Sequence, residues 1–229
     1  SSYAQHLLEE DVDPFLENIG TIWKIHYELC KKTSNTTAYW IFSHLNNPDF
    51  NRDDLELKLR EFAIKSGKIK SSKVEAGLKS IKPDINVVLA MYCRARTKKG
   101  GKEEDILSPL AELNLVRRTG DNRYTLNTGL KKTLPQGLFI ASIVDFWENK
   151  DQQAGIPSNS IRVDSLLYDP LSPGRIFILS EHELTDRLRN LPLQTDGALE
   201  LSETSGILQI MKRQDKFNAN TLLAKWADK

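Results

Sequence analysis

Two carboxylates and a histidine near the N-terminus have the residue types that acid–base or metal-assisted chemistry uses. Asp13 and Glu17 lie four residues apart at the start of a predicted helix, and His26 lies further along it. Negative charge at a helix N-terminus also complements the helix dipole, so helix capping is the favoured interpretation of both carboxylates. His26 stands between Ile25 and Leu29 on an apolar face, where a hydrogen-bonded core histidine is favoured over a metal ligand.

A second set of residues has the composition of a PD-ExK nuclease site. In such a site carboxylates like Asp49 and Glu56 hold a divalent ion, and a lysine like Lys58 positions the water. These residues fall on a charged helix rather than on strands, so a solvated helix face is favoured. Cys30 and Cys93 have no CxxC or Cys/His cluster around them, which excludes a zinc site or disulfide framework and favours a reducing cytoplasm. Phosphate loops, GxSxG, HExxH and Rossmann fingerprints are missing.

Positive charge is concentrated in the middle of the 229-residue chain, although the net charge is only +1. Residues 1–64 hold six Lys and Arg against eleven Asp and Glu, a balance of −5. Residues 65–132 hold sixteen against seven, a balance of +9, and residues 133–229 hold ten against thirteen, a balance of −3. Such segregation favours a surface that binds a polyanion, because Lys and Arg supply most non-specific nucleic-acid affinity. A lysine-rich solvated face is the alternative.

The candidate DNA contacts lie along one predicted helix, in the loop after the next helix, and on a predicted ribbon. None of their spacings encodes a base sequence. Arg175, in the string SPGR, is a further candidate that meets either a phosphate or a local carboxylate. The remaining candidates are Lys70, Lys73, Arg94, Arg96, Lys98, Lys99, Lys102, Arg117, Arg118 and Arg123.

The elements that must position these residues follow from hydrophobic periodicity and breakers. Asp13 and Pro14 predict a cap and a first-turn proline, and Pro83 predicts a break between two helices. A β-hairpin is predicted at 113–118 and 123–127, around the turn 119–122. Three helices and a ribbon form the winged-helix pattern, in which a helix enters the major groove and the ribbon touches phosphate. The predicted helices span 15–31, 35–46, 51–67, 71–81 and 83–95.

The same order recurs in the second half without a sequence period. Helices are predicted over 134–149, 161–168, 180–190 and 218–227, with a hairpin at 197–201 and 206–211. The fold class is therefore mainly α with short β-hairpins: two winged-helix-like modules preceded by a helical hairpin. The expected domains are the helical hairpin (1–48), the basic winged-helix-like domain (49–132) and the C-terminal helix-plus-hairpin domain (133–229). No apolar run is long enough for a membrane span, so a soluble protein is expected. The two isolated cysteines favour a cytoplasmic location.

Particular strings of the sequence resemble a family of bacterial proteins first catalogued without a known function. Members are found beside sulfur-handling enzymes in DNA phosphorothioation gene clusters. The resemblance extends from about Asp13 to Trp226. The strings are DPFLE (13–17), GTIWKIH (20–26), YWIF (39–42), SPLAEL (108–113) and LLYDPLSPGRIF (166–177).

Within that family, the sequence resembles the nickase subunits of Ssp-type systems, an SspB-like group. The resemblance implies a DNA-binding and DNA-nicking subunit of an antiviral restriction–modification defence that places sulfur in the DNA backbone. It implies a divalent metal (Mg²⁺ or Mn²⁺) and, because they occupy the family motif, catalytic roles for Asp13, Glu17 and His26. The implied partners are double-stranded DNA, a cysteine desulfurase and a reductase-like ATP-using protein, with no membrane; a homodimer stays open.

Family members usually carry a further helical segment before the Asp-Pro motif, so this chain is expected to lack it, together with residues needed for nicking. The alternative function is a non-catalytic winged-helix adaptor that holds DNA or partner proteins. A transcriptional regulator is disfavoured, because no dimerisation helix with sustained apolar heptads is present.

Overall fold

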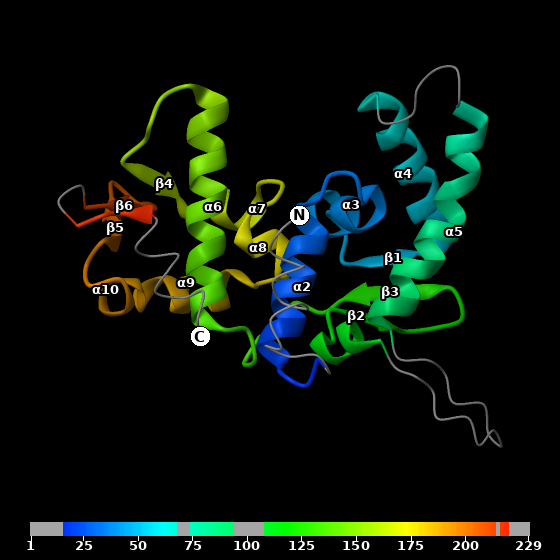
Figure 1. Ribbon diagram of the computed structural model, residues 1–229, viewed down its shortest axis with the longest axis horizontal. Helices are drawn as coiled ribbons and strands as arrows, with labels where there is room; N and C mark the ends of the chain where they lie inside the picture. The colour runs from blue at the N-terminus through cyan, green and yellow to red at the C-terminus, as the bar shows by residue number, and fades with distance from the viewer. Residues whose placement is uncertain (1–15, 68–73, 94–107, 214–215, 220–229) are drawn as a thin grey trace. The chain divides into compact units, whose positions relative to one another are not determined.

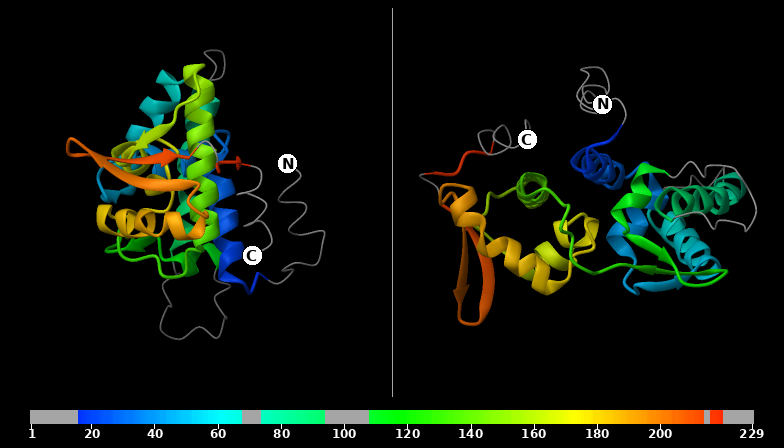
Figure 2. Two further views of the ribbon diagram at one scale, coloured as in Figure 1. Left: turned by 90° about the vertical axis from the view of Figure 1, so that its left-hand side faces the viewer. Right: turned by 90° about the horizontal axis from the view of Figure 1, so that it is seen from below.

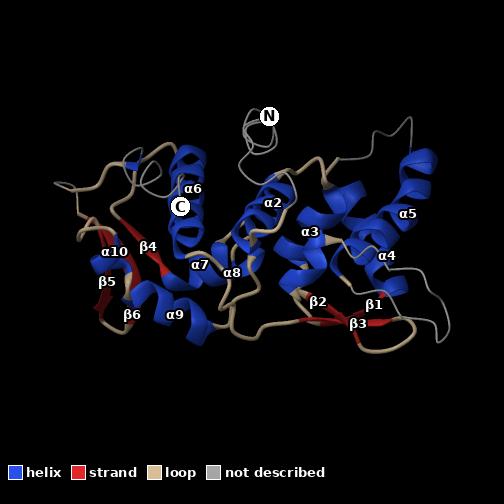
Figure 3. Cartoon of the chain, turned by 60° about the horizontal axis from the view of Figure 1, so that its bottom comes forward, coloured by secondary structure: helices blue, strands red, loops and turns tan. Residues whose placement is uncertain are grey.

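The computed structural model describes residues 16–67, 74–93, 108–213 and 216–219, which form helices and short antiparallel strands (Figure 1). The chain divides into two compact units, residues 1–127 and 128–229. Helices dominate both units, and the described residues of each include one three-stranded sheet (Figure 3). The predicted mainly α fold with short β-hairpins is confirmed. No helix within the described ranges is both long and apolar enough to cross a membrane.

The first unit has the element order helix, helix, strand, helix, helix, 3₁₀ turn, strand, strand. Its elements are α2 (Ile19–Lys31), α3 (Thr36–His44), β1 (Asp49–Asn51), α4 (Arg52–Lys65), α5 (Val74–Tyr92), η2 (Pro109–Leu113), β2 (Val116–Arg118) and β3 (Arg123–Leu126).

Helix α2 begins later than the sequence pattern predicts. Leu16 has a left-handed φ of 54°, so the chain cannot be helical there. Asn18 caps the helix, and its Oδ1 accepts a hydrogen bond of 2.8 Å from the Gly20 amide. The predicted cap at Asp13 lies outside the described residues.

Helices α4 and α5 lie side by side (Figures 1 and 2). Asn51 caps α4: its Oδ1 accepts a hydrogen bond of 2.8 Å from the Asp54 amide. The predicted break at Pro83 is wrong, since α5 runs through it as one helix. Ile81 and Ile85 are buried on both sides of Pro83, whereas the proline is exposed. Packing therefore holds both halves of the helix in line, and the hydrogen bond that proline removes is lost on the solvent side.

The sheet of the first unit has the strand order β1-β3-β2. The predicted hairpin β2–β3 is confirmed, and β1, which the sequence analysis missed, pairs with β3 from the other side. Phe50 of β1 stacks on Tyr124 of β3 with ring centroids 5.6 Å apart. Together with Val116 and Leu126 these rings form the buried face of the sheet.

The second unit has a related order among its described residues: one helix precedes its first strand, and four helices lie between that strand and its hairpin. Its sheet order, β4-β6-β5, matches that of the first unit. The elements are α6 (Gln136–Ala154), β4 (Ser160–Arg162), α7 (Val163–Tyr168), α8 (Pro173–Ile176), α9 (Glu181–Arg189), α10 (Leu191–Gln194), β5 (Leu199–Thr204) and β6 (Ile207–Lys212).

Three details of the second unit differ from the predictions. Ile161 and Arg162, predicted to begin a helix, belong to strand β4. Helix α6 continues to Ala154, where Gly155 with φ 70° ends it. The β5–β6 turn consists of Ser205 and Gly206, both with positive φ, rather than residues 202–205. The predicted closing helix at 218–227 falls almost entirely outside the described residues.

A close backbone contact joins α7 to α8. A Cβ on Gly174 would lie 2.6 Å from Leu167 Cα and 2.7 Å from the Leu167 carbonyl oxygen. Only glycine allows the two short helices to approach this closely.

A polar cluster ties the end of α6 to β6. The Ser158 hydroxyl donates to Asp151 Oδ1 at 2.6 Å, and Lys212 Nζ lies 3.3 Å from Asp151 Oδ2. The Trp147 indole N–H donates to the Ser158 hydroxyl at 2.7 Å. Burial alone would raise the pKa of Asp151, but the bonds from Ser158 and the charge of Lys212 outweigh it and lower that pKa.

Candidate nucleic-acid interface

Four of the residues predicted to contact DNA lie in the described parts of the chain. Arg117, Arg118 and Arg123 lie on the ribbon of the first unit, whereas Arg175 belongs to the second unit. The other predicted contacts lie outside the described residues: Lys70, Lys73, Arg94, Arg96, Lys98, Lys99 and Lys102.

The three ribbon arginines do not share one face of the sheet. Residues paired across antiparallel strands point to the same side, and residues two apart on one strand do so as well. Arg117 pairs with Thr125, and Arg123 is two residues from Thr125, so both arginines project from the solvent side. Arg118 pairs with the buried Tyr124 and therefore projects from the opposite side, at the exposed end of the strand.

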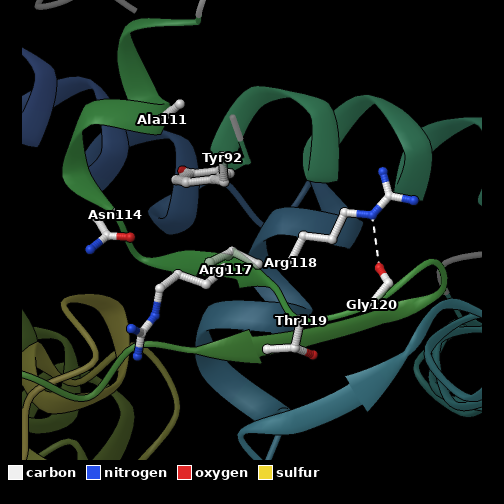
Figure 4. Close-up of a pocket in the computed structure, with 8 residues that line it drawn as sticks. Tyr92, Ala111, Asn114, Arg117, Arg118, Thr119 and Gly120 are labelled. Atoms are coloured by element: carbon white, nitrogen blue, oxygen red, sulfur yellow. Dashed lines mark hydrogen bonds between the residues drawn. The ribbon is translucent and has the colours of Figure 1, made fainter. Parts of the chain in front are cut away.

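Arg118 is held at the hairpin turn. Its Nε donates to the Gly120 carbonyl at 2.9 Å (Figure 4). Its terminal nitrogen donates to the Asp121 carbonyl at 2.7 Å. It also lies close enough to Cys93, just after α5, to affect that thiol. Burial raises the pKa of Cys93 to about 11, while the positive charge of Arg118 acts in the opposite direction. The Cys93 thiol donates to the Val116 carbonyl at 3.7 Å, so the end of α5 contacts β2.

A cavity of about 350 Å³ lies along β2, one of the two edge strands of the sheet (Figure 4). Tyr92 and Asn114 line it together with Arg117 and Arg118, and none of the described lining residues carries a carboxylate. The Arg117 guanidinium donates to the neutral Asn127 Oδ1 at 3.2 Å. Arg117 and Arg118 border this cavity, the β2 cavity, from opposite sides of the strand, and their positive charges, with no carboxylate among the described lining residues, give it an attraction for anions.

A second cavity of about 410 Å³ has a different charge balance. Arg123 lines it together with Asp49 and Asp54. The carboxylates offset the positive charge of Arg123, so this cavity attracts a phosphate less strongly than the β2 cavity does. Sequence reasoning could not separate Arg123 from Arg117, because Asp49 comes next to the ribbon only through the pairing of β1 with β3.

Arg175 lies on α8, where Ser172 caps the first turn through a 3.3 Å bond to the Arg175 amide. Its Nε donates to the Tyr168 carbonyl at 3.2 Å. Burial lowers the pKa of the guanidinium. Arg175 is therefore partly desolvated and holds the preceding loop in place.

His26 lies in the core of the first unit. Its ring is 0% exposed, and Nδ1 forms a 2.7 Å hydrogen bond with the Tyr92 hydroxyl. Cys30 Sγ lies 3.6 Å from the same nitrogen, and the Phe42 ring packs edge-on at a centroid distance of 4.8 Å. Burial raises the pKa of both the Cys30 thiol and the Tyr92 hydroxyl. This geometry is that of an enclosed core histidine.

The remaining predicted catalytic residues do not come together with His26 in the described structure. Glu17 is exposed before the start of α2, and Asp13 lies outside the described residues. Glu56, from the PD-ExK-like string, forms an ion pair with Arg60 on the same helix, with 2.7 Å between the carboxylate oxygen and the guanidinium nitrogen. Within residues 16–67, 74–93, 108–213 and 216–219, no group of three or more His, Cys, Asp or Glu could hold a metal ion.

Asn114 and Asn127 are site residues that sequence reasoning missed. Asn127 donates to the Asn114 carbonyl at 2.9 Å while it accepts from Arg117, which links the ribbon to the turn after η2. Asn114 has a left-handed φ of 50°, a conformation that asparagine tolerates better than most residues. The only sequence signal is this residue type at a turn.

Comparison with known proteins confirms the family seen in the sequence strings. The family described as "Protein of unknown function (DUF4007)" matches residues 1–226. No curated protein matches the chain. Two solved structures share its fold, described as "SspB crystal structure" and "Magnesium ion-bound SspB crystal structure". Each has a TM-score of 0.73 and 23% sequence identity, and the match covers 94% of this chain and 62% of that chain.

Proposed function

The chain belongs to the DUF4007 family, and from this premise we propose that it is the DNA-binding, DNA-nicking subunit of a bacterial phosphorothioation defence system. The proposed partners are double-stranded DNA, a cysteine desulfurase and a reductase-like ATP-using protein. Two findings support the system: the family match and the fold shared with SspB. The whole activity is a proposal, since the chain spans only 62% of the length of SspB.

The observation that carries DNA binding is the β2 cavity. Arg117 and Arg118 bring two charges to an exposed ribbon without a carboxylate among the described lining residues. The ribbon follows a pair of helices, the order found in winged helices, where a ribbon contacts the DNA backbone. Phosphate contacts of this kind release counterions and provide affinity that does not depend on sequence.

For nicking, Asp13, Glu17 and His26 remain the proposed catalytic residues, with Mg²⁺ or Mn²⁺ as the proposed ion. The described residues do not fit such an ion, because they include no group of three or more His, Cys, Asp or Glu that could hold it. The enclosure of His26 favours a second candidate, a non-catalytic winged-helix adaptor that holds DNA or partner proteins.

The test of DNA binding is fluorescence anisotropy with a labelled duplex over a salt series. The plot of log affinity against log salt should lose about 0.9 of its slope in Arg117→Ala, because one phosphate contact is gone. Arg162→Ala is the matched control, since Arg162 is exposed on the second unit and paired with Asp164 at 2.6 Å. Failure of the unaltered protein to bind at low salt would overturn the proposal.

The test of nicking is relaxation of supercoiled plasmid with Mg²⁺, with Mn²⁺ and with a chelator. A nickase relaxes the plasmid only with metal, and Glu17→Gln abolishes the activity. If the protein binds the plasmid but never breaks a strand, also when the two partner proteins are added, the adaptor function replaces the nickase.

A further inference from the structure

Strand β5 lies at an edge of the second sheet, with a paired neighbour on one side only. It has six residues, whereas β1, β2 and β4, the other edge strands of the described sheets, have three each. Its sequence, LELSET, contains no lysine and no proline, the residues that commonly protect an exposed edge. The tip of the β5–β6 hairpin extends beyond the helices of its own unit in both views of Figure 2. Strand β5 therefore offers an edge on which a further extended strand can pair.

The outward backbone groups of β5 are those of Leu199, Leu201 and Glu203. The Arg213 amide donates to the Ala198 carbonyl at 3.0 Å, which shows that Ala198 faces β6. Every second residue after Ala198 therefore also faces β6, and the residues between them direct their N–H and C=O groups away from the sheet.

Thr195 covers the first of these three positions. The Leu199 amide donates to Thr195 Oγ1 at 3.0 Å, and the same hydroxyl lies 3.5 Å from the Leu199 carbonyl oxygen. Leu201 and Glu203 have no such partner among the residues that the structure describes. Their outward N–H and C=O groups form the free part of the strand edge, the β5 edge.

We infer that the β5 edge pairs with the β5 edge of a second copy of this chain, antiparallel and around a two-fold axis at Ser202. In this register Leu201 pairs with Glu203 of the second copy, and Glu203 pairs with its Leu201. Each free N–H of the edge then meets a C=O of the other copy, so no group of the edge stays unpaired. The inference does not depend on the proposed DNA binding.

The side chains of the two edges are compatible in this register. Ser202 lies opposite Ser202 of the second copy, a type of pair that hydrogen-bonds across strands. Glu200, which forms an ion pair with Arg213 at 3.4 Å, lies opposite Thr204. The two Glu203 positions lie diagonally, about 7–8 Å apart, where salt and solvent weaken their repulsion. No like charges of the two strands are therefore directly opposite each other.

The turn of the hairpin fits the same register. The chain turns at Ser205 and Gly206, both with positive φ, directly after Thr204. The strand of the second copy therefore ends opposite Glu200 and turns away before it would meet Thr195.

The two neighbouring registers are unfavourable. Centred on Leu201, the pairing would set Glu203 against Leu199, whose backbone groups Thr195 already binds. Centred on Glu203, it would set the two Glu203 carboxylates directly opposite each other, which is destabilising. The β5 edge thus favours the register around Ser202.

The first experiment measures the oligomeric state of the whole chain by size-exclusion chromatography with light scattering over a concentration series. The mass should rise toward twice that of one chain as the concentration increases. Leu201→Pro removes the outward N–H but no hydrogen bond to β6, so it should abolish this rise. Leu201→Ala keeps the N–H and is the matched control that should still dimerise. Circular dichroism checks the fold of both variants.

The second experiment tests the register with a disulfide. Ser202→Cys places a thiol on the two-fold axis, in a pair whose Cα atoms are about 4.5 Å apart, within the range of a disulfide. Mild oxidation should convert this variant into a covalent dimer. Ser205→Cys, beyond the paired residues, is the control and should cross-link much more slowly. Cys30 and Cys93 are free thiols in every sample, so the unaltered protein is oxidised in parallel.

Two outcomes would overturn the inference. In the first, the chain stays a monomer at every concentration and Ser202→Cys forms no covalent dimer. In the second, the chain dimerises, but Leu201→Pro dimerises equally well and Ser205→Cys cross-links as fast as Ser202→Cys, so the copies meet through another surface. Neither outcome affects the proposed DNA binding, which depends on residues of the first unit.

Discussion

The hydrogen bond between His26 and Tyr92 should hold much of the first unit together. Tyr92→Phe keeps the ring, which is 1% exposed, and removes only the hydroxyl that lies 2.7 Å from His26 Nδ1. No large cavity forms, so the loss is that of the buried polar contacts of this hydroxyl, to His26 and to the Cys30 thiol. Leaving a buried polar group without its partner costs about 1–3 kcal/mol of unfolding free energy.

The assay is urea unfolding followed by tryptophan fluorescence, because Trp23 is buried beside His26 with ring centroids 5.9 Å apart. Tyr92→Phe should lower the midpoint without changing the slope. Tyr168→Phe, at a side chain that is 59% exposed, is the control and should leave the midpoint unchanged. In the His26→Leu background Tyr92→Phe should cost less, since both partners are then apolar.

A loss below about 0.5 kcal/mol in Tyr92→Phe, the range of ordinary surface substitutions, would refute this reasoning. The same result would show that the hydrogen bond does not fix His26 in the core. His26 would then be available for the catalytic role that the family motif implies.

Three further predictions concern packing and titration. Gly174→Ala should lower the unfolding free energy by roughly 1–3 kcal/mol, because the added Cβ would overlap the backbone of Leu167. Gly120→Ala, where the added Cβ meets only the Arg123 side chain at 3.5 Å, should be tolerated, and thermal unfolding compares the two variants. Ser158→Ala should raise the pKa of Asp151, because two hydrogen bonds to its carboxylate are affected. The stabilisation by this carboxylate is present above its ordinary pKa of 3.8, and in the variant it should be lost at a less acidic pH than in the unaltered protein. Urea unfolding across acid pH measures this loss, and an unchanged dependence of stability on pH would contradict the prediction. Because the pKa of Cys93 is raised from 9.0 to about 11, the protonated thiol should stabilise the fold below pH 9.0, and this stabilisation should be lost as the pH rises toward about 11. Alkylation of the thiol should accelerate over the same pH range, and rapid alkylation at neutral pH would disprove the prediction.

The long helices and the two hairpins could be predicted from the sequence, because their signals are local. Apolar residues such as Leu55 and Leu59 recur at helical spacing, and a turn-forming string separates β2 from β3. The helix break predicted at Pro83 is wrong, because the effect of a proline depends on whether packing on both sides holds the helix straight. Strands β1 and β4 are three residues long, too short for an alternating pattern, and exist only because partner strands accept them.

The candidate site could be predicted only in part. Residue types indicated that Arg117, Arg118 and Arg123 belong to a basic ribbon, and the ribbon is present. Which arginine lies near carboxylates depends on strand register and on Asp49, which is far away in the sequence.

The strand order of the sheets determines when each unit can complete its folding. Asp49 of β1 pairs with Thr125, whereas only residues 119–122 separate β2 from β3. Closing a long loop costs more conformational entropy than closing a short one, and non-local pairing slows folding. We expect the hairpin to form early and β1 to dock only after α4 and α5 have packed. The same order holds for β4, whose Ile161 pairs with Ile210. The basic ribbon is therefore fixed in its final geometry at the last step, when the helices beside it are already in place.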